Sequence, residues 1–306
     1  MNSEPHLLSG VIVPMITPFT RDGNLDEAAA GRIARRLAAH NIAVFVLGTT
    51  GETASIPRTD RFRLVSTVLR AVENRVPVYA GIGDNCFTNA VSAAERYLDA
   101  GVAAVVSHLP SYYPLTPDEM QLYFEHLHDR VQGPLVLYNI PATTGMSLPL
   151  AVVEYLSELP RIIGLKDSER IDGRMEDAAR RFAGRDDFAL FMGTSVLSVD
   201  ALKLGYNGLV PNSGNLVPAL WEKLYNHARA GEWAEAAELQ TQLNEVAWVF
   251  QGNRTLGQSL AALKVLLAKQ GLCYQRLGQI DQARAMGQRV AERDPEHALG
   301  KWLNNL

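Results

Sequence analysis

One lysine stands out as a candidate nucleophile. Lys166 is the only lysine before Lys203 in a chain that holds six lysines and 23 arginines. It follows an apolar run, residues 162–165, that is typical of a buried strand. Burying an ammonium without a partner is costly; desolvation favours the neutral amine, which can add to a carbonyl carbon. The pattern indicates a Schiff-base lysine. The alternative is a strand-end lysine whose ammonium reaches solvent.

Schiff-base chemistry also needs groups that carry protons to and from the carbinolamine and the enamine. Tyr138 ends another apolar run, and its phenol is a candidate for that task. The hydroxyl of Thr49, in the sequence GTTGE at residues 48–52, can relay the proton. The two glycines of that sequence allow close approach of the backbone, so its amides and Thr50 are candidates to hold a carboxylate. Glu52 is expected to support the loop amides. The alternative for Tyr138 is a tyrosine of the core whose hydroxyl is hydrogen-bonded. The alternative for the two glycines is a tight turn that binds no ligand.

The elements that must position these residues alternate between short apolar runs and longer helical patterns. The expected strands are residues 10–16, 43–47, 76–80, 102–106, 134–138, 162–166, 188–192 and 208–210. Each is followed by a helical pattern, as at residues 25–40, where apolar residues recur every four positions. The strands are apolar on both faces, as a sheet covered by helices requires. Eight such units predict a closed (β/α)8 barrel, the TIM-barrel fold.

The chain continues beyond the eighth unit. Residues 233–249, 257–269 and 280–293 read as helices. We therefore expect a catalytic barrel domain over residues 1–230 and a C-terminal helical region over residues 231–306.

The unusual residues fall at the ends of the expected strands. In a (β/α)8 barrel these ends meet at one mouth, where reactive groups gather. An amine, phenols and hydroxyls would thus converge from separate strands, and this convergence favours a catalytic role for Lys166. Asp167 is expected to be structural, because successive strand residues point to opposite faces.

Composition excludes several classes of function. A formal net charge of −4 gives no electrostatic basis for binding nucleic acid or an anionic membrane. Two cysteines, Cys86 and Cys273, make no disulfide framework, so a reducing cytoplasm is expected. The N-terminal residues lack a signal pattern, and the apolar run at residues 260–268 is too short to span a membrane.

Metal and cofactor sites are not expected. The seven histidines are scattered, and no HxxxH or CxxC spacing occurs. The GIG sequence at residues 81–83 lacks the third glycine of a dinucleotide-binding motif.

Four motifs together resemble one enzyme family. GTTGE at residues 48–52, the tyrosine pair at 112–113, YNIP at 138–141 and GLKD at 164–167 stand in the order and spacing of the dihydrodipicolinate synthase/N-acetylneuraminate lyase family. The resemblance covers about residues 10–273. It implies a class I, pyruvate-handling lyase on a TIM barrel, without a cofactor and usually a homotetramer built as a dimer of dimers.

The resemblance also implies roles for single residues. Lys166 matches the lysine that forms the imine with pyruvate or another 2-oxo acid. Tyr138 matches the tyrosine of the proton relay, and Thr49 matches its hydroxyl. Thr50 matches the residue that helps to hold the carboxylate of the 2-oxo acid. Tyr113 matches the tyrosine that a neighbouring subunit contributes to the relay.

Two further positions bear on the substrate. Val210 matches an apolar position whose backbone lies against bound pyruvate. Thr143 occupies the place where the synthase branch of the family carries an arginine for the carboxylate of the second substrate. The lyase branch carries acidic residues after the seventh strand, whereas residues 193–196 here are small and uncharged.

We therefore predict a class I aldolase that cleaves or forms a 4-hydroxy-2-oxo acid, to or from pyruvate and an aldehyde with a small or weakly polar side chain. Dihydrodipicolinate synthase, with another group replacing the arginine, is one alternative. An aldolase or dehydratase of 2-keto-3-deoxy sugar acids is another. A non-catalytic sensor that binds a 2-oxo acid is the alternative from a different class.

Overall fold

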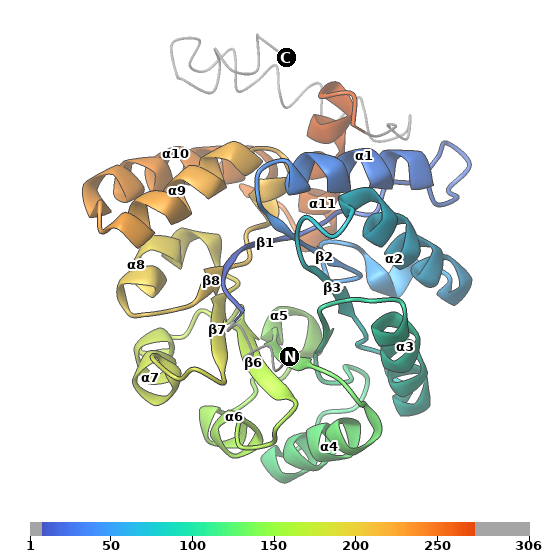
Figure 1. Cartoon of the computed structure of the whole chain (residues 1–306), viewed down its shortest axis with the longest axis vertical. Helices are drawn as coiled ribbons and strands as arrows, with labels where there is room; N and C mark the ends of the chain where they lie inside the picture. Colours follow the sequence, from blue (N-terminus) through green and yellow to red (C-terminus); the bar gives the residue numbers. More distant parts are fainter. Residues whose placement is uncertain (1–7, 273–306) are drawn as a thin grey trace.

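Eight parallel strands close into a barrel in the computed structural model, which describes residues 8–272 (Figure 1). Each strand pairs with its successor, and β1 pairs with β8 to close the ring. The predicted TIM barrel is confirmed. The strands are β1 (Gly10–Pro14), β2 (Ala43–Val46), β3 (Val78–Gly81), β4 (Ala104–Ser107), β5 (Leu135–Asn139), β6 (Ile162–Asp167), β7 (Ala189–Met192) and β8 (Gly208–Leu209).

Helices surround the barrel. They are α1 (Glu27–Ala38), α2 (Arg58–Val72), α3 (Phe87–Asp99), α4 (Pro117–Arg130), α5 (Pro141–Thr144), α6 (Leu150–Leu156), α7 (Arg174–Phe182), α8 (Ser198–Lys203) and α9 (Pro218–Ala230), followed by α10 (Trp233–Gln251) and α11 (Leu256–Lys269). The described part of the chain also contains three short 3-10 helices, η1 (Thr53–Ser55), η2 (Ser195–Leu197) and η3 (Asn212–Asn215). The expected helix at residues 280–293 lies outside the described residues.

Local sequence explains where several helices begin. The Thr116 side chain accepts a hydrogen bond from the Glu119 amide, the Glu119 side chain accepts one from the Thr116 amide, and Pro117 occupies the first turn of α4. The Asp26 side chain accepts a hydrogen bond from the Ala29 amide at the start of α1. These caps satisfy amides that have no partner within the helix.

The strands divide their side chains between two apolar cores. One core lies between the strands and the surrounding helices. The other fills the barrel, where alternate strand residues point inward, among them Ile12, Phe45, Tyr79, Tyr138 and Phe191. This alternation places Lys166 inside the barrel among apolar side chains and turns Asp167 outward.

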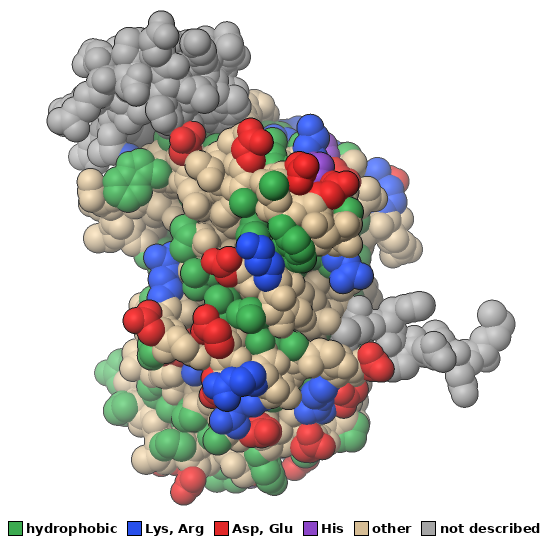
Figure 2. Space-filling model, turned by 90° about the vertical axis from the view of Figure 1, so that its left-hand side faces the viewer, with side chains coloured by type: hydrophobic (Ala, Val, Ile, Leu, Met, Phe, Trp, Pro, Cys, Tyr) green, Lys and Arg blue, Asp and Glu red, His purple; other side chains and the backbone are tan. Residues whose placement is uncertain are grey.

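The helices after the barrel pack back onto it. α10 contacts both α9 and α11. The guanidinium of Arg36 in α1 donates hydrogen bonds to the carbonyls of Asn215 and Leu216 and to the Gln270 side chain just beyond α11. Within residues 8–272, no helix is long and apolar enough to cross a membrane. Basic and acidic side chains are interspersed on the face that Figure 2 presents.

Candidate active site

The site is built around the amine of Lys166. Lys166 is 6% exposed and Tyr138 is 4% exposed, and the two residues are directly paired neighbours on β6 and β5. The Lys166 Nζ lies 3.7 Å from the centre of the Tyr138 ring and 5.0 Å from the centre of the Phe45 ring. The two rings meet edge to face at 6.4 Å. Aromatic faces at these distances stabilise a cation that has lost its hydration shell.

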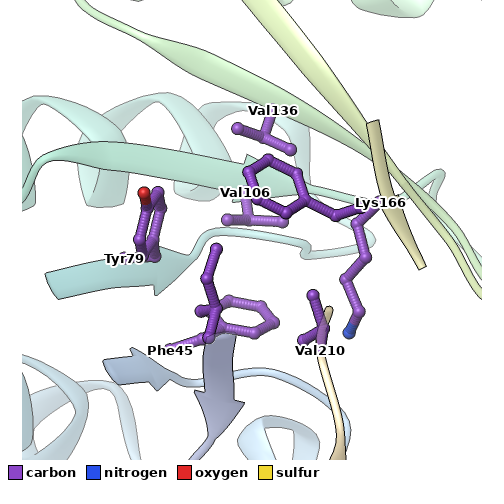
Figure 3. Close-up of a pocket in the computed structure, with 8 residues that line it drawn as sticks. Phe45, Tyr79, Val106, Val136, Lys166 and Val210 are labelled. Atoms are coloured by element: carbon purple, nitrogen blue, oxygen red, sulfur yellow. The ribbon is translucent and has the colours of Figure 1, made fainter. Parts of the chain in front are cut away.

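A small apolar pocket, with a cavity volume of about 20 Å³, lies beside Lys166. Its walls are the inward residues of seven other strands or strand ends: Ile12, Phe45, Tyr79, Val106, Val136, Phe191 and Val210. Figure 3 shows the Lys166 nitrogen beside Val210, while the Tyr79 hydroxyl points away from it. Burial raises the pKa of Tyr79, so its phenol remains neutral. The amine therefore stands against uncharged walls.

The loop at residues 47–52 brings two hydroxyls to this amine's end of the barrel. The Thr49 Oγ1 lies 3.5 Å from the Tyr138 hydroxyl, the long limit of a hydrogen bond. Thr50 is 8% exposed in the same loop. The loop comes so close to β3 that a Cβ on Gly81 would lie 2.0 Å from the Leu47 carbonyl oxygen. Only glycine fits there, so Gly81 allows the loop to pack over the barrel.

The same loop is strained. Leu47 has φ +59° and Glu52 has φ +55°, and both are non-glycine residues in the left-handed region. Such conformations cost about 1–3 kcal/mol each and persist only where the surroundings impose them. One constraint is the Thr17 hydroxyl, which is fully buried and donates a 2.6 Å hydrogen bond to the Gly51 carbonyl. The two strained residues bracket the two threonines, so the strain lies on either side of the residues that approach the site.

A buried polar network lies on the outside of β5 and β6. Asp167 and Glu169 share the guanidinium of Arg174, whose Nε lies 2.7 Å from Asp167 Oδ2 and 3.1 Å from Glu169 Oε2. The Asn139 amide donates hydrogen bonds to both carboxylates, and the Ser147 hydroxyl donates another to Glu169. Asn139 and Asp167 each follow one of the paired residues Tyr138 and Lys166. The network therefore fixes the two backbones that carry the phenol and the amine.

His108, just after β4, supports the other side of Tyr138. The two rings meet edge to face with their centres 6.2 Å apart. Burial lowers the pKa of His108, and the positive charge of Lys166 lowers it further. The His108 Nδ1 lies 2.7 Å from the Leu109 carbonyl oxygen, so in the neutral ring Nδ1 carries the proton and donates it. A Cβ on Gly83 would clash with this ring at 2.2 Å, so Gly83 provides its space.

The structure brings together some of the predicted site residues and separates others. Lys166 and Val210 line the pocket, the Tyr138 ring lies against the Lys166 amine, and Thr49 approaches the Tyr138 hydroxyl, with Thr50 next to Thr49 in the chain. Thr143 is exposed in α5, where its hydroxyl donates a hydrogen bond to the Ile140 carbonyl. Tyr113 is 72% exposed and contacts the ring of Tyr112, which is 75% exposed. In the single chain, Tyr113 is therefore a surface residue.

Sequence reasoning missed several residues that touch the site. Phe45 forms a wall of the pocket, and its inward place in a strand was the only signal available. His108 directly follows β4, and its position at a strand end could have marked it as a candidate site residue. The carboxylate of Glu52, expected at the loop amides, forms an ion pair with Lys264 of α11. No sequence pattern linked those two residues.

Comparison with known proteins identifies relatives along most of the chain. The model of the dihydrodipicolinate synthetase family matches residues 7–278. A 4-hydroxy-tetrahydrodipicolinate synthase of Methanopyrus kandleri is 32% identical over 242 residues, which make up 77% of this chain and 79% of that protein. An uncharacterized DapA-like lyase of Thermofilum pendens is 27% identical over 288 residues, 92% of this chain and 95% of that protein. YagE, an E. coli K12 prophage protein of the dihydrodipicolinic acid synthase family whose crystal structure is a complex with pyruvate, aligns with a TM-score of 0.84 at 25% identity, covering 93% and 99% of the two chains.

A closed (β/α)8 barrel with a lysine buried at the end of β6 defines an enzyme of the class I aldolase type. The chain belongs to the dihydrodipicolinate synthetase family, and it is an aldolase or lyase of that family.

Because two buried carboxylates share the guanidinium of Arg174, we expect this residue to contribute to the free energy of unfolding. Arg174→Met leaves two buried carboxylates without a counter-charge, which should lower the free energy of unfolding by about 3–5 kcal/mol. Glu169→Gln removes one of two like charges and leaves Asp167 paired with Arg174, so its effect should be much smaller. Urea unfolding at pH 7 and one protein concentration compares the two variants. Equal losses would show that the guanidinium does not balance both carboxylates.

Proposed function

We propose that this chain is a Schiff-base aldolase that cleaves or forms a 4-hydroxy-2-oxo acid, with pyruvate and an aldehyde as the two halves. The observation that carries the proposal is the placement of the Lys166 amine, 3.7 Å from the Tyr138 ring in a pocket with uncharged walls. The pyruvate complex of YagE supports pyruvate as the 2-oxo acid.

In the proposed reaction, the Lys166 amine adds to the C2 carbonyl of the 2-oxo acid, and loss of water from the carbinolamine gives the protonated imine. The C3–C4 bond then breaks, and its electron pair flows to the imine nitrogen to form an enamine. The proton of the C4 hydroxyl passes to the relay of Tyr138 and Thr49 at the same step, and the aldehyde is released. Protonation of the enamine at C3 and hydrolysis return pyruvate and the free amine. The imine nitrogen is the electron sink, so the sequence needs no added cofactor.

The surrounding residues divide the remaining tasks. Tyr138 carries protons to and from the carbinolamine, and Thr49 relays them through the hydroxyl that lies 3.5 Å away. Thr50 and the backbone amides of its loop hold the carboxylate of the 2-oxo acid. Val210 lies against the bound 2-oxo acid and excludes water from one side of the imine. Thr143 lies at the entrance for the aldehyde half.

In the proposed enzyme, residues 1–230 are the catalytic barrel and residues 231–306 are a helical region. The enzyme would act in the cytoplasm as a homotetramer built from two tight dimers. The substrates are small molecules, with no role for nucleic acid or membrane.

The names of the relatives favour a second candidate, 4-hydroxy-tetrahydrodipicolinate synthase. That activity requires recognition of a carboxylate on the second substrate. Thr143, in the position of the arginine of the synthase branch, is uncharged, and its hydroxyl is engaged with the Ile140 carbonyl. We therefore place the synthase second. A dehydratase that uses the same imine would differ only in the bond that breaks, and its product would distinguish it.

The covalent step can be trapped directly. Incubation with pyruvate and borohydride should attach one pyruvate-derived group to each subunit at Lys166, since the imine carbon accepts hydride. Peptide mapping by mass spectrometry locates the group, and Lys166→Ala should remain unlabelled. Labelling of Lys203 or Lys264 instead would contradict the assignment. Labelling at Lys166 without turnover of any 4-hydroxy-2-oxo acid in a panel would favour the sensor alternative.

Thr143 provides a test of the substrate class. Aspartate semialdehyde should be a poor acceptor for the wild-type enzyme, and Thr143→Arg should improve its kcat/KM. Each charge-assisted hydrogen bond is worth about 1.5–3 kcal/mol, which corresponds to roughly a 10- to 100-fold gain. Thr143→Lys is the matched control, since it adds charge without the two-pronged geometry and should gain less. Efficient wild-type turnover of aspartate semialdehyde would restore the synthase as the first candidate.

Tyr113 should act across the tight dimer. The exposed rings of Tyr112 and Tyr113 form a surface that a partner subunit would cover, and the phenol of Tyr113 would then reach the partner's relay. Tyr113→Phe keeps the packing and removes the hydroxyl, so it should leave the oligomer intact and lower kcat by roughly 100-fold. Tyr112→Phe is the neighbouring control and should change kcat little.

Mixing Tyr113→Phe with Lys166→Ala should recover activity after subunit exchange, because one site of each mixed dimer is then complete. If native mass spectrometry confirms exchange and no activity returns, Tyr113 does not act across the interface.

A further inference from the structure

The strained loop at residues 47–52 receives a contact from the far end of the described chain. The ammonium of Lys264, in the middle of α11, pairs with the carboxylate of Glu52. The same ammonium lies 4.4 Å from the centre of the Phe19 ring. Its side chain is 20% exposed and that of Glu52 is 28% exposed, so the pair is shielded from solvent on most sides. A helix outside the eight βα units thus reaches the loop that carries Thr49 and Thr50.

The backbone of Glu52 ties this ion pair to the threonines. Its amide donates a 3.0 Å hydrogen bond to the Thr49 carbonyl, and its φ of +55° is a conformation that a glutamate adopts only under constraint. The Glu52 Oε1 atom is buried, so its charge needs a counter-charge in place. Lys264 supplies that charge, and the position of α11 therefore helps to determine the conformation of residue 52.

The C-terminal end of α11 is itself fixed to the barrel. Gln270, the residue after α11, accepts a hydrogen bond from Arg36 of α1 at 3.2 Å and donates one to the Leu216 carbonyl. The helix also packs against α10. Because α11 is held in place at that end, the backbone of Lys264 is also held in place. A lysine on a flexible segment would not have such a fixed position.

From these contacts we infer that the Glu52–Lys264 ion pair is a positioning device that holds the loop of Thr49 and Thr50 in its strained conformation, so that α11 is part of the active site's support. Glu52 and Lys264 are positioning residues, since neither is placed in contact with the substrate. The inference rests on the proposed function for its kinetic consequence. Its structural consequence, a loosened loop, is independent of that function.

Two measurements test the inference on the full-length protein. Hydrogen–deuterium exchange of peptides covering residues 47–55 reports the loop itself, and pyruvate trapping by borohydride reports its effect on imine formation. Lys264→Met and Glu52→Gln should each increase exchange in that segment, and each should raise the pyruvate concentration for half-maximal trapping roughly three- to tenfold. The double variant should lose no more than either single variant, because each change removes the same interaction. Lys264→Arg keeps the charge and should recover most of both properties.

Lys269→Met is the matched control, because Lys269 is an exposed lysine in the last turn of the same helix. It should leave both readouts at the wild-type level. Thermal unfolding of each variant separates loosening of the loop from general loss of structure. The inference is overturned if Lys264→Met and Lys269→Met behave alike in exchange and trapping, or if the effects of Lys264→Met and Glu52→Gln add. Absence of trapping in the wild-type protein would overturn the proposed function instead, while the exchange measurement would still decide the role of the ion pair.

Discussion

The feature on which the rest of this site depends is an amine buried inside an apolar barrel. Lys166 is almost fully buried, and its neighbours in the pocket are aromatic and aliphatic. Asp167, the nearest carboxylate along the chain, faces outward and pairs with Arg174. The rings of Tyr138 and Phe45 lie close enough to stabilise a cation, yet they exert a weaker attraction than a carboxylate in contact would. Such surroundings suit the proposed role of Lys166, in which the amine would lose a proton, become an imine and be regenerated.

The loop at residues 47–52 must be held in a strained backbone conformation. The proposed roles of its two threonines require a fixed loop geometry, although Leu47 and Glu52 hold conformations that an isolated chain avoids. Contacts from three directions impose that conformation: the Thr17 hydroxyl after β1, the close approach of β3 at Gly81, and the ammonium of Lys264. A loop determined from several sides loses little of its geometry when substrate arrives, which favours pre-organised binding.

Much of this arrangement follows from local sequence patterns. The eight βα units come from the periodicity of apolar residues, and the candidate roles of Lys166 and Tyr138 come from unusual residue types at strand ends. The pairing of Glu52 with Lys264 does not follow, because residues far apart in the chain meet only after the barrel has closed. The outward direction of Asp167 was predicted from strand alternation, whereas its partners depend on where α7 begins. Tyr113 was assigned by resemblance alone, since no pattern within one chain specifies what its exposed ring will meet.

Because side chains alternate along β5 and β6, each strand carries one residue of the candidate site on its inner face and one residue of the polar network on its outer face. On β5, Tyr138 faces the barrel interior and Asn139 faces outward; on β6, Lys166 faces the barrel interior and Asp167 faces outward. The outer pair is joined by a hydrogen bond and locked by Arg174, so the polar network can be rigid without placing a charge beside the amine. Thr143 lies in the short helix just beyond β5 and outside this network, where its side chain is exposed. Substitutions at that position should therefore leave the relation between phenol and amine unchanged. In the proposed aldolase, this separation would allow one barrel to serve several aldehydes with the same imine chemistry.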